Sequence, residues 1–390
     1  MPAALRVLAL EPFHGGSHRQ FLEQWAQRSG HGFTILGLPA SHWKWRMRQS
    51  APVLARQVAE RAERGERWDV LLCSDMLDLA GFRGLAPREA ARLPAIAYFH
   101  ENQLTYPVQR EEERDLHFAL TNVTTALAAD EVWFNSEYHR ASLLDAVSAW
   151  LERMPDRRLA WAPDAVAPRC RVEWPGVEGP GAPPAERTQG APLRVLWAAR
   201  WEHDKDPETL IAALERVDPS LDLEISILGQ RFADTPAVFD QAPARLGARL
   251  VDLGFVERER YGEILRAADL VVSTARHEFF GLALVEAVLA GARPLLPDRL
   301  VYPELLAAAG CSPERARRFS WSGGPNELAR RLETVAREIA HPAGSARARA
   351  ASERNELRAG FQVFTWPRRL PALDGGLERV AATVARSTRD

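Results

Sequence analysis

Two glutamates, Glu278 and Glu286, flank a short segment with the pattern of a strand, a tight loop and a helix. The mainly apolar run 268–272 is typical of a buried strand, and apolar residues at helical spacing follow Gly281. From Gly281 to Glu286 such a helix rises about 7.5 Å. The carboxylates could accept hydrogen bonds from two ends of one ligand, and the amides at the helix start suit a diphosphate between them. The spacing fits a sugar, a diphosphate and a ribose in a row; the alternative is that both glutamates are merely solvated.

Two cations follow a predicted strand at 193–197, and a predicted helix comes after them. Arg200 can bind two phosphate oxygens and Lys205 can act as a point charge, so both could converge on one diphosphate. The charge on such a leaving group grows as its bond to the sugar breaks, so the cations would act most strongly in the transition state. They could also be unrelated surface residues. Asp204 and Asp206 resemble an Asp-x-Asp metal motif, but phosphate binding by Lys205 matches the position better.

Polar residues also stand where strands of the first half are predicted to end. Gly15 and Gly16 follow the strand 5–10 and would let the backbone approach an anion, although the dinucleotide fingerprint Gly-x-Gly-x-x-Gly is missing. His100 ends a strand at 96–99. Three further polar residues follow it: Glu101, Asn102 and Gln103. Because open parallel sheets bind ligands at the carboxyl ends of their strands, these residues are candidates for a substrate site. The alternative for His100 is a structural role.

Between residues 43 and 48, aromatic rings and positive charges alternate: Trp43, Lys44, Trp45, Arg46 and Arg48. Indole faces can stack on bases and cations can pair with phosphates, so this segment is a candidate for RNA binding. The alternative is the start of an amphipathic helix with its tryptophans packed inward.

The composition is that of an ordinary globular enzyme. The 390 residues favour two domains, and 46% are hydrophobic and 26% charged. A net charge of −2 creates no global attraction for nucleic acid, so RNA binding needs a local basic patch. The three cysteines have no metal or disulfide spacing. Because no signal peptide and no apolar run near the ~20 residues of a membrane span are found, we expect a cytoplasmic protein.

Alternating strand and helix patterns in both halves predict an α/β fold with two parallel-sheet domains. A stretch rich in proline and glycine, 179–192, separates them as a linker. We therefore expect a first domain at 1–178, a second domain at 193–360, and a C-terminal segment at 361–390. The last helix is expected around 377–384.

The segment from Glu278 to Glu286, together with Arg200 to Lys205, resembles the donor half of retaining GT-B glycosyltransferases. A longer set of segments is similar to one subfamily, the tRNA-queuosine alpha-mannosyltransferases: 11–18, 43–48, 98–107, 134–136, 200–207 and 277–281. The resemblance implies a GT-B fold, in which two Rossmann-like domains face each other across a cleft. It implies that 1–178 is the N-terminal acceptor-side domain and 193–360 the nucleotide-sugar-binding domain, and that the last helix returns to the first domain. It also implies transfer of mannose from GDP-mannose to queuosine at a tRNA wobble position, with retention of the anomeric configuration.

Residue roles follow from the resemblance by position. Arg200 and Lys205 would hold the diphosphate, Glu278 the mannose hydroxyls, and Glu286 the ribose, while His100 would face the reacting sugar. The remaining donor-binding candidates are Gly15, Gly16, Gln230, Phe255, Val256, Phe280, Gly281 and Leu282. The acceptor-binding candidates are Trp43, Lys44, Trp45, Arg46, Arg48, Glu101, Asn102 and Gln103.

No residue stands out as a covalent nucleophile, so we expect same-face departure, with the donor phosphate accepting the acceptor proton. Neither a metal nor another cofactor is expected, because Arg200 and Lys205 would neutralise the leaving group. A nucleotide sugar and tRNA are the expected partners, without a membrane or an obligatory protein partner. The alternatives are a retaining hexosyltransferase acting on a lipid or small metabolite, and a non-catalytic module that binds RNA or nucleotide sugars.

Overall fold

The computed structural model describes residues 4–108, 114–179, 190–232, 234–340 and 345–387. The chain divides into two compact units, one formed by Met1–Gly176 with Trp366–Asp390 and the other by Val177–Thr365. Each unit contains a six-stranded sheet in which all paired strands are parallel. The predicted α/β class with two parallel sheets is confirmed.

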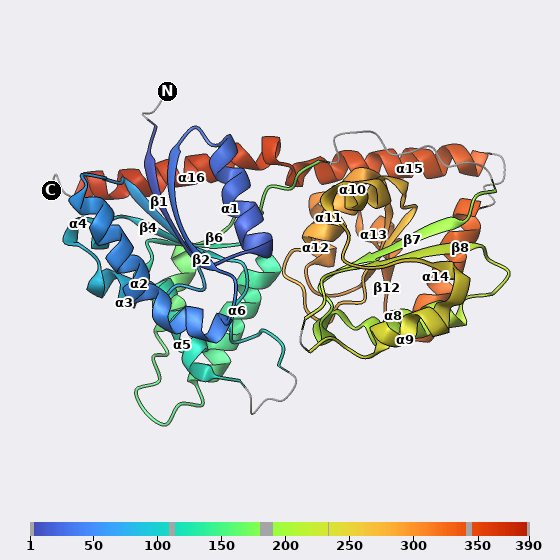
Figure 1. Ribbon diagram of the computed structural model, residues 1–390, viewed down its shortest axis with the longest axis horizontal. Coiled ribbons are helices and arrows are strands. Elements are labelled where there is room, and N and C mark those ends of the chain that lie inside the picture. Colours follow the sequence, from blue (N-terminus) through green and yellow to red (C-terminus); the bar gives the residue numbers. More distant parts are fainter. Residues whose placement is uncertain (1–3, 109–113, 180–189, 233, 341–344, 388–390) are drawn as a thin grey trace. The chain divides into compact units, whose positions relative to one another are not determined.

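The strands of the first unit have the order β2-β1-β3-β4-β5-β6 (Figure 1). These strands are β1 (Arg6–His14), β2 (Gly32–Pro39), β3 (Val70–Ser74), β4 (Ala95–Phe99), β5 (Glu131–Phe134) and β6 (Cys170–Val172). The helices are α1 (Gly16–Arg28), α2 (Trp43–Glu63), α3 (Leu79–Leu85), α4 (Arg88–Ala91), α5 (Leu116–Ala128), α6 (Glu137–Leu151), α7 (Ala162–Val166) and α16 (Trp366–Ser387).

Strand β1 lies between two hydrophobic clusters. Leu8 and Leu10 pack in a cluster with residues of α2, α3, α5 and α6, whereas Val7 and Ala9 pack with residues of α1 and α16. Successive side chains of a strand point to opposite faces, so helices must cover both faces of this sheet. This double burial explains why β1 has an apolar sequence without polar alternation.

Helix α16 belongs to the first unit although it follows the second unit in sequence. It begins at Trp366, well before the expected start near 377. Leu377 is fully buried, and Asp374 accepts a hydrogen bond from the Trp25 indole nitrogen at 2.8 Å. The chain therefore completes the first core only with its last helix.

The second unit has the strand order β12-β11-β10-β7-β8-β9. Its strands are β7 (Leu193–Ala198), β8 (Leu223–Leu228), β9 (Leu250–Gly254), β10 (Leu270–Val272), β11 (Arg293–Pro297) and β12 (Ser320–Trp321). Its helices are α8 (Pro207–Arg216), α9 (Val238–Leu246), α10 (Arg258–Ala267), α11 (Leu282–Ala290), α12 (Tyr302–Ala308), α13 (Pro313–Arg317), α14 (Pro325–Ala340) and α15 (Ser345–Phe361).

Four neighbouring strands of this second sheet end at segments that the sequence marked as donor-binding. The segments are 200–205 after β7, Gln230 after β8, 255–256 after β9 and Glu278 after β10. Parallel strands place their carboxyl ends on one edge, which is where α/β sheets bind ligands. Within the described ranges, no helix combines the length and the apolar character needed to cross a membrane.

Candidate active site

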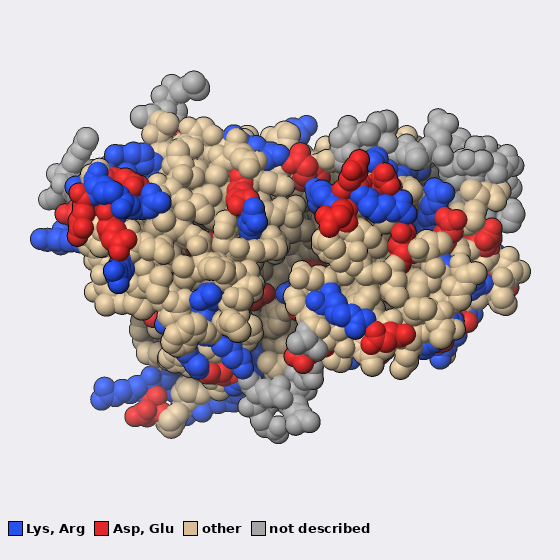
Figure 2. Space-filling model, in the orientation of Figure 1, with Lys and Arg blue, Asp and Glu red and all other residues tan. Residues whose placement is uncertain are grey.

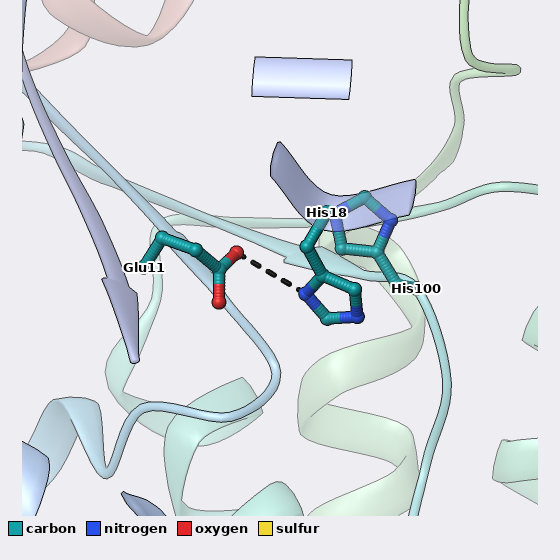
Figure 3. Close-up of side chains that lie close together, drawn as sticks. All are labelled: Glu11, His18 and His100. Carbon is teal, nitrogen blue, oxygen red and sulfur yellow. Dashed lines mark hydrogen bonds and ion pairs between the residues drawn. The ribbon is translucent and has the colours of Figure 1, made fainter. Parts of the chain in front are cut away.

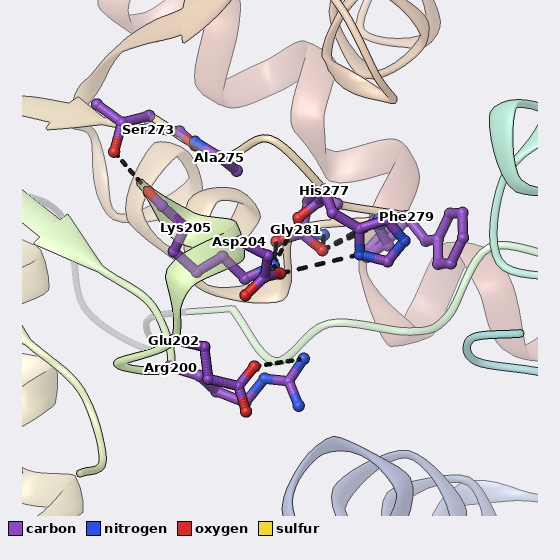
Figure 4. A network of polar contacts seen from close by, with 12 residues as sticks. Arg200, Glu202, Asp204, Lys205, Ser273, Ala275, His277, Phe279 and Gly281 are labelled. Atoms are coloured by element: carbon purple, nitrogen blue, oxygen red, sulfur yellow. Dashed lines mark hydrogen bonds and ion pairs between the residues drawn. The ribbon is translucent and has the colours of Figure 1, made fainter. Parts of the chain in front are cut away.

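Lys205 forms the centre of a polar network in the second unit (Figure 4). It ends a short 3-10 helix, His203–Lys205, and only 5% of it is exposed. Its Nζ lies 3.0 Å from Asp204 Oδ2 and 3.3 Å from Glu278 Oε2, and it donates to the carbonyl oxygen of His277 at 2.7 Å. Burial would lower the pKa of Lys205, but the Glu278 and Asp204 carboxylates raise it above its ordinary value. The ammonium group is therefore charged and held in place before any ligand binds.

Glu278 links Lys205 to the start of α11. Its Oε1 accepts hydrogen bonds from the amides of Phe279, Phe280 and Gly281 at 3.2, 3.4 and 3.1 Å. Burial favours the neutral acid, but the charges of Lys205, His277 and Arg200 and the hydrogen bond from Lys205 together outweigh it and leave the pKa of Glu278 below its ordinary value. The carboxylate is thus ionised and fixed by four donors.

These bonds revise one expectation about the helix start. The loop amides of Phe279, Phe280 and Gly281 donate to Glu278, so they do not face an open anion position. The N-cap of α11, Gly281, has a left-handed φ of 81° and makes no side-chain capping bond. The amides of the first helical turn, beginning at Leu282, are consequently the ones that suit a phosphate.

Glu286 lies 6% exposed on α11, beside a cavity of about 230 Å³. Tyr261 donates its hydroxyl to Oε2 at 2.9 Å, and Arg258 approaches Oε1 at 3.3 Å. Burial and the neighbouring Glu286 raise the pKa of Tyr261 well above its ordinary value, so the phenol keeps its proton and remains a donor. Glu178 and Gly179 complete one side of the cavity. A buried glutamate at the wall of a cavity is suited to accept hydrogen bonds from a bound hydroxyl group.

The other predicted donor residues are more exposed. Arg200 is half exposed and lies 3.4 Å from Glu202. Gln230 is exposed, and its carbonyl oxygen accepts a hydrogen bond from the amide of Trp201. The Phe255 side chain is 69% exposed, while Val256 is partly buried.

Both carboxylates of the Asp-x-Asp sequence have partners within the unit. Asp204 pairs with Lys205, whereas Asp206 caps α8 through Thr209 and pairs with Arg276 at 2.9 Å. Asp206 occupies a left-handed conformation with φ 48°. These contacts account for the two aspartates by charge pairing and helix capping.

A second polar cluster lies at the carboxyl ends of β1 and β4 in the first unit (Figure 3). Glu11 Oε2 is 3.2 Å from His18 Nδ1, and both residues are more than nine-tenths buried. Glu11 Oε1 also accepts hydrogen bonds from the Phe13 amide and the Ser74 hydroxyl, each at 2.9 Å. Burial would lower the pKa of His18, but Glu11 raises it to about 9. Glu11 and His18 therefore form a buried ion pair.

The His100 ring stacks on this ion pair, 4.1 Å from the His18 ring and tilted by 34°. Burial, and next the charge of His18, lower the pKa of His100 well below its ordinary value. Its amide donates to Asp75 and its carbonyl oxygen accepts from Asn135, each at 2.9 Å. The imidazole of His100 is thus held neutral in a fixed orientation.

Glu11, His18 and His100 bring three possible metal ligands within 4.8 Å of one another. A protonated His18 cannot bind a metal through the nitrogen that faces Glu11, and Glu11 already accepts three hydrogen bonds. The close approach of the His18 and His100 rings needs no metal, since a Glu11–His18 ion pair beside a neutral His100 also accounts for it. The expectation of an enzyme without a metal stays a prediction.

The loop after His100 is stabilised by hydrogen bonds between its own residues. Asn102 is fully buried, and its Oδ1 accepts from the amides of Leu104 and Thr105 at 3.1 and 2.8 Å. We therefore no longer expect Asn102 to touch an acceptor, and we assign it to shaping the loop. Gln103 is 8% exposed and donates to the partly buried Glu101 at 3.3 Å.

The predicted RNA-binding segment opens α2, but its side chains differ in exposure. Trp43 and Trp45 are 38% and 60% exposed, whereas Met47 packs inward. Trp45 therefore does not pack inward, whereas the Trp43 ring lies 5.3 Å from the ring of the buried Phe118. Arg46 donates to the Pro39 carbonyl oxygen at 2.9 Å, and Arg48 binds Asp115 at 2.7 Å.

Gly15 and Gly16 begin α1. A Cβ on Gly15 would lie 2.3 Å from the Cβ of Ala40, so only glycine fits there without a shift. Gly16 has a left-handed φ of 52° and is exposed. Packing against the end of β2 is thus one demonstrated reason for this pair of glycines.

Comparisons with known proteins give the family. A sequence model of the N-terminal region of tRNA-queuosine alpha-mannosyltransferases matches residues 6–177, and a model of group 1 glycosyl transferases matches residues 183–333. A curated tRNA-queuosine alpha-mannosyltransferase of Drosophila melanogaster is 36% identical over 310 residues, covering 77% of this chain and 81% of the relative. The chain belongs to the tRNA-queuosine alpha-mannosyltransferase family. It is accordingly a glycosyltransferase, and the recognised resemblance is confirmed.

Solved structures show the GT-B fold of this family member independently. Sucrose-phosphate synthase from Thermosynechococcus elongatus matches with a TM-score of 0.69 and 15% identity, over 99% of this chain and 98% of that one. The Anabaena HepE protein in complex with UDP and glucose matches with a TM-score of 0.62 and 18% identity, over 98% and 100% of the two chains.

The site residues predicted for this mannosyltransferase-family chain do not include several residues that lie in the candidate site. These residues are near Glu286 in the second unit and near His100 in the first. Glu11 and His18 belong to the segment 11–18 that carried the resemblance, but only its glycines were chosen. Asp75 directly follows β3 and lies fully buried, where it accepts a hydrogen bond from the His100 amide. Polar residues at strand ends were the available signal, since Glu11 interrupts and Asp75 follows a buried apolar run. Tyr261 had no such signal, because only the packing of α10 against α11 brings it to Glu286.

Proposed function

We propose that this protein transfers mannose from GDP-mannose to queuosine in the anticodon of tRNA. The observation that carries the proposal is the 36% identity to a tRNA-queuosine alpha-mannosyltransferase. The aligned 310 residues are too many for either unit alone, so the likeness must extend into both. The network around Lys205 and Glu278 supports a nucleotide-sugar donor, because it combines a fixed cation with fixed carboxylates.

Lys205 has the position of a group that stabilises the departing diphosphate. Its ammonium is buried and fixed by two carboxylates and a carbonyl oxygen, so little reorganisation is needed when negative charge develops nearby. Arg200 adds a second, more exposed cation after the same strand. Two cations on one diphosphate can replace the metal that other transferases use, so we propose a reaction without a metal or another cofactor.

Glu278 and Glu286 supply the acceptors for sugar hydroxyls. In the proposed complex Glu278 binds mannose and Glu286 binds the ribose, in place of one of its present donors. The neutral His100 imidazole would face the sugar, where it can exchange hydrogen bonds without adding charge. With no nucleophile assigned, the acceptor hydroxyl attacks from the face that the diphosphate leaves, the donor phosphate takes the hydroxyl proton, and the anomeric configuration is retained.

The exposed rings of Trp43 and Trp45, with Lys44 beside them, support contact with tRNA bases and phosphates. We place the reaction in the cytoplasm, with no membrane and no obligatory protein partner.

The test is incubation of the purified protein with GDP-mannose and total tRNA from cells with and without queuosine, followed by mass spectrometry of the digested nucleosides. We expect a hexose adduct that depends on queuosine and is lost in Lys205→Ala. Lys44→Ala, at the other lysine of the chain, should reduce transfer to tRNA while leaving donor hydrolysis unchanged. GDP release with another acceptor but no tRNA adduct would refute the acceptor, and an adduct only from another nucleotide sugar would refute the donor.

A further inference from the structure

A groove of about 730 Å³ lies in the first unit, away from the Glu11–His18–His100 cluster. It is lined by the loop after β4, the start of α5, and the end of α6 with the residues that follow. The lining residues are Leu104, Arg114, Leu116, Ala146, Ala149, Trp150, Arg153 and Met154. Its volume is within the range of about 300–1,000 Å³ that is usual for small-ligand sites.

The groove combines apolar walls with two positive charges. Leu104, Leu116 and Met154 offer apolar surface, and Leu116 is 39% exposed. The charged members are Arg114 and Arg153, and none of the lining residues is acidic. Apolar contact for a base, with a guanidinium group for a phosphate, is a combination that can hold one nucleotide of a nucleic-acid strand.

The two arginines have different tasks. One nitrogen of Arg114 donates to the carbonyl oxygens of Gln103, Leu104 and Tyr106 at 3.2, 2.7 and 2.9 Å, so this side chain holds the loop after β4. Arg153 is exposed. Arg114 is therefore a positioning residue, while Arg153 is the cation available to a bound phosphate.

A chain neighbour of the groove lining contacts the exposed segment at the start of α2. Asp115, between two lining residues, binds Arg48 at 2.7 Å. Arg48 lies 4.8 Å above the Phe118 ring, and Trp43 lies 5.3 Å from the same ring. Figure 2 shows Lys and Arg side chains gathered on the lower part of this unit, over the region of α5 and the segment after α6.

We propose that this groove binds a nucleotide of the acceptor RNA other than the one that receives the sugar, with its base on Leu116 and Met154 and its phosphate on Arg153. The proposal rests on the proposed function, since it assumes an RNA acceptor. The loop 101–107 connects His100 with the groove, because its first residues follow His100 and Leu104 lines the groove. A nucleotide held here fixes the RNA strand relative to the loop beside the reacting base.

The test compares Arg153→Glu and Leu116→Ser with Arg56→Glu, a control on α2 whose side chain is 83% exposed. Equilibrium binding of tRNA is measured over a series of salt concentrations, and sugar transfer is measured with tRNA and with free queuosine nucleoside. We expect Arg153→Glu to weaken tRNA binding by roughly tenfold or more, and to reduce the slope of log K against log salt by about one. Leu116→Ser should weaken binding with the slope unchanged. Transfer to the free nucleoside should stay at the wild-type rate in all three variants.

Unchanged tRNA affinity in both groove variants would overturn the proposal, as would equal losses with tRNA and with the nucleoside. A wild-type protein that binds tRNA through Arg153 but transfers no sugar to it would support the groove and refute the proposed function. A wild-type protein with no affinity for tRNA would refute both.

Discussion

Two buried charge clusters, Lys205 with Asp204 and Glu278 and His18 with Glu11, are constrained by their neighbours. Lys205 is 5% exposed between two carboxylates, and His18 is 7% exposed against Glu11. Removing one partner of such a pair leaves the other charge buried without solvent or a counter-ion. This lowers the stability of the fold more than removing both partners does. Each pair therefore couples local stability to the chemistry expected nearby.

Replacing Lys205 by methionine should affect both properties. We expect kcat to fall by about 100-fold or more, because a fixed donor to the leaving group is lost. Stability should fall by about 3 kcal/mol, because Asp204 and Glu278 are left unpaired. Adding Glu278→Gln should restore part of the unfolding midpoint without restoring turnover. A double variant as inactive as the single one, but no more stable, would show that the pair does not carry the stability.

The Glu11–His18 pair predicts a specific dependence of stability on pH. The pKa of His18 is raised from 6.5 to about 9, so its contribution is complete below pH 6.5 and is lost as the pH rises through 9. At about 1.4 kcal/mol per pH unit, this amounts to about 3 kcal/mol. The difference in unfolding free energy between wild type and His18→Gln should therefore shrink between pH 6.5 and 9. His117→Gln, an exposed histidine of the same unit, should show no such change.

The same substitution has a catalytic readout. His18 helps to hold the pKa of His100 down, so removing its charge should raise that pKa. The acid limb of the pH–rate profile would then move to higher pH in His18→Gln. An acid limb at the wild-type position, despite a stable fold, would show that His18 acts only on stability.

At the scale of elements, the junctions between strands and helices decide the site. Gly281 ends the loop after β10 and begins α11 with a left-handed φ of 81°. Its Cβ position has no neighbour closer than 3.6 Å, so a side chain there would strain the backbone without a severe clash. The conformation of this one residue sets where the first turn of α11 points.

Gly281→Ala should cost about 1–2 kcal/mol in stability, the price of a left-handed alanine. Gly310→Ala is a matched control, because Gly310 has a φ of 80° and open space around its Cβ position. Both variants should lose similar stability, but only Gly281→Ala should raise the KM for the donor. Equal KM values for the donor in the two variants would show that the start of α11 does not take part in donor binding.

At the scale of the whole molecule, each unit has hydrophobic packing of its own, and the chain returns to the first unit to complete one of the clusters there. Helix α16 supplies Leu373, Leu377 and Val380 to the core of the first sheet. The second unit has its own core, which includes Leu214 at 0% exposure. Because the cores are separate, a cavity in one should not directly weaken the other.

Leu377→Ala should destabilise the first unit by about 2–5 kcal/mol, and Leu214→Ala should do the same to the second. Hydrogen exchange read by mass spectrometry should show the loss of protection in β4 for the first variant and in β8 for the second. Simultaneous loss in both sheets from either substitution would mean that the chain unfolds as one cooperative unit.

The sequence by itself determined the fold class and the family of the protein, and it predicted a donor site. Apolar runs alternating with helical patterns predicted two parallel sheets, because strands buried on both faces must be apolar. Arg200, Lys205 and Glu278 stood out because charged residues in the loops after buried strands lie at the ligand-binding edge of a sheet. Glu286 stood out by its spacing from Glu278, and it lies within α11 in the structure. The predicted donor segments 200–205, 255–256 and Glu278 follow strand ends in the structure.

Only the tertiary structure decided which side chains are buried or hydrogen-bonded by other residues of the chain. The sequence could not show that Asn102 forms hydrogen bonds within its own loop, that Met47 packs inward while Trp45 stays exposed, or that Tyr261 reaches Glu286. Nor could it pair Glu11 with His18 and stack His100 on them. Burial and hydrogen bonding depend on which distant segments meet, and a linear pattern carries that information only for residues on one element.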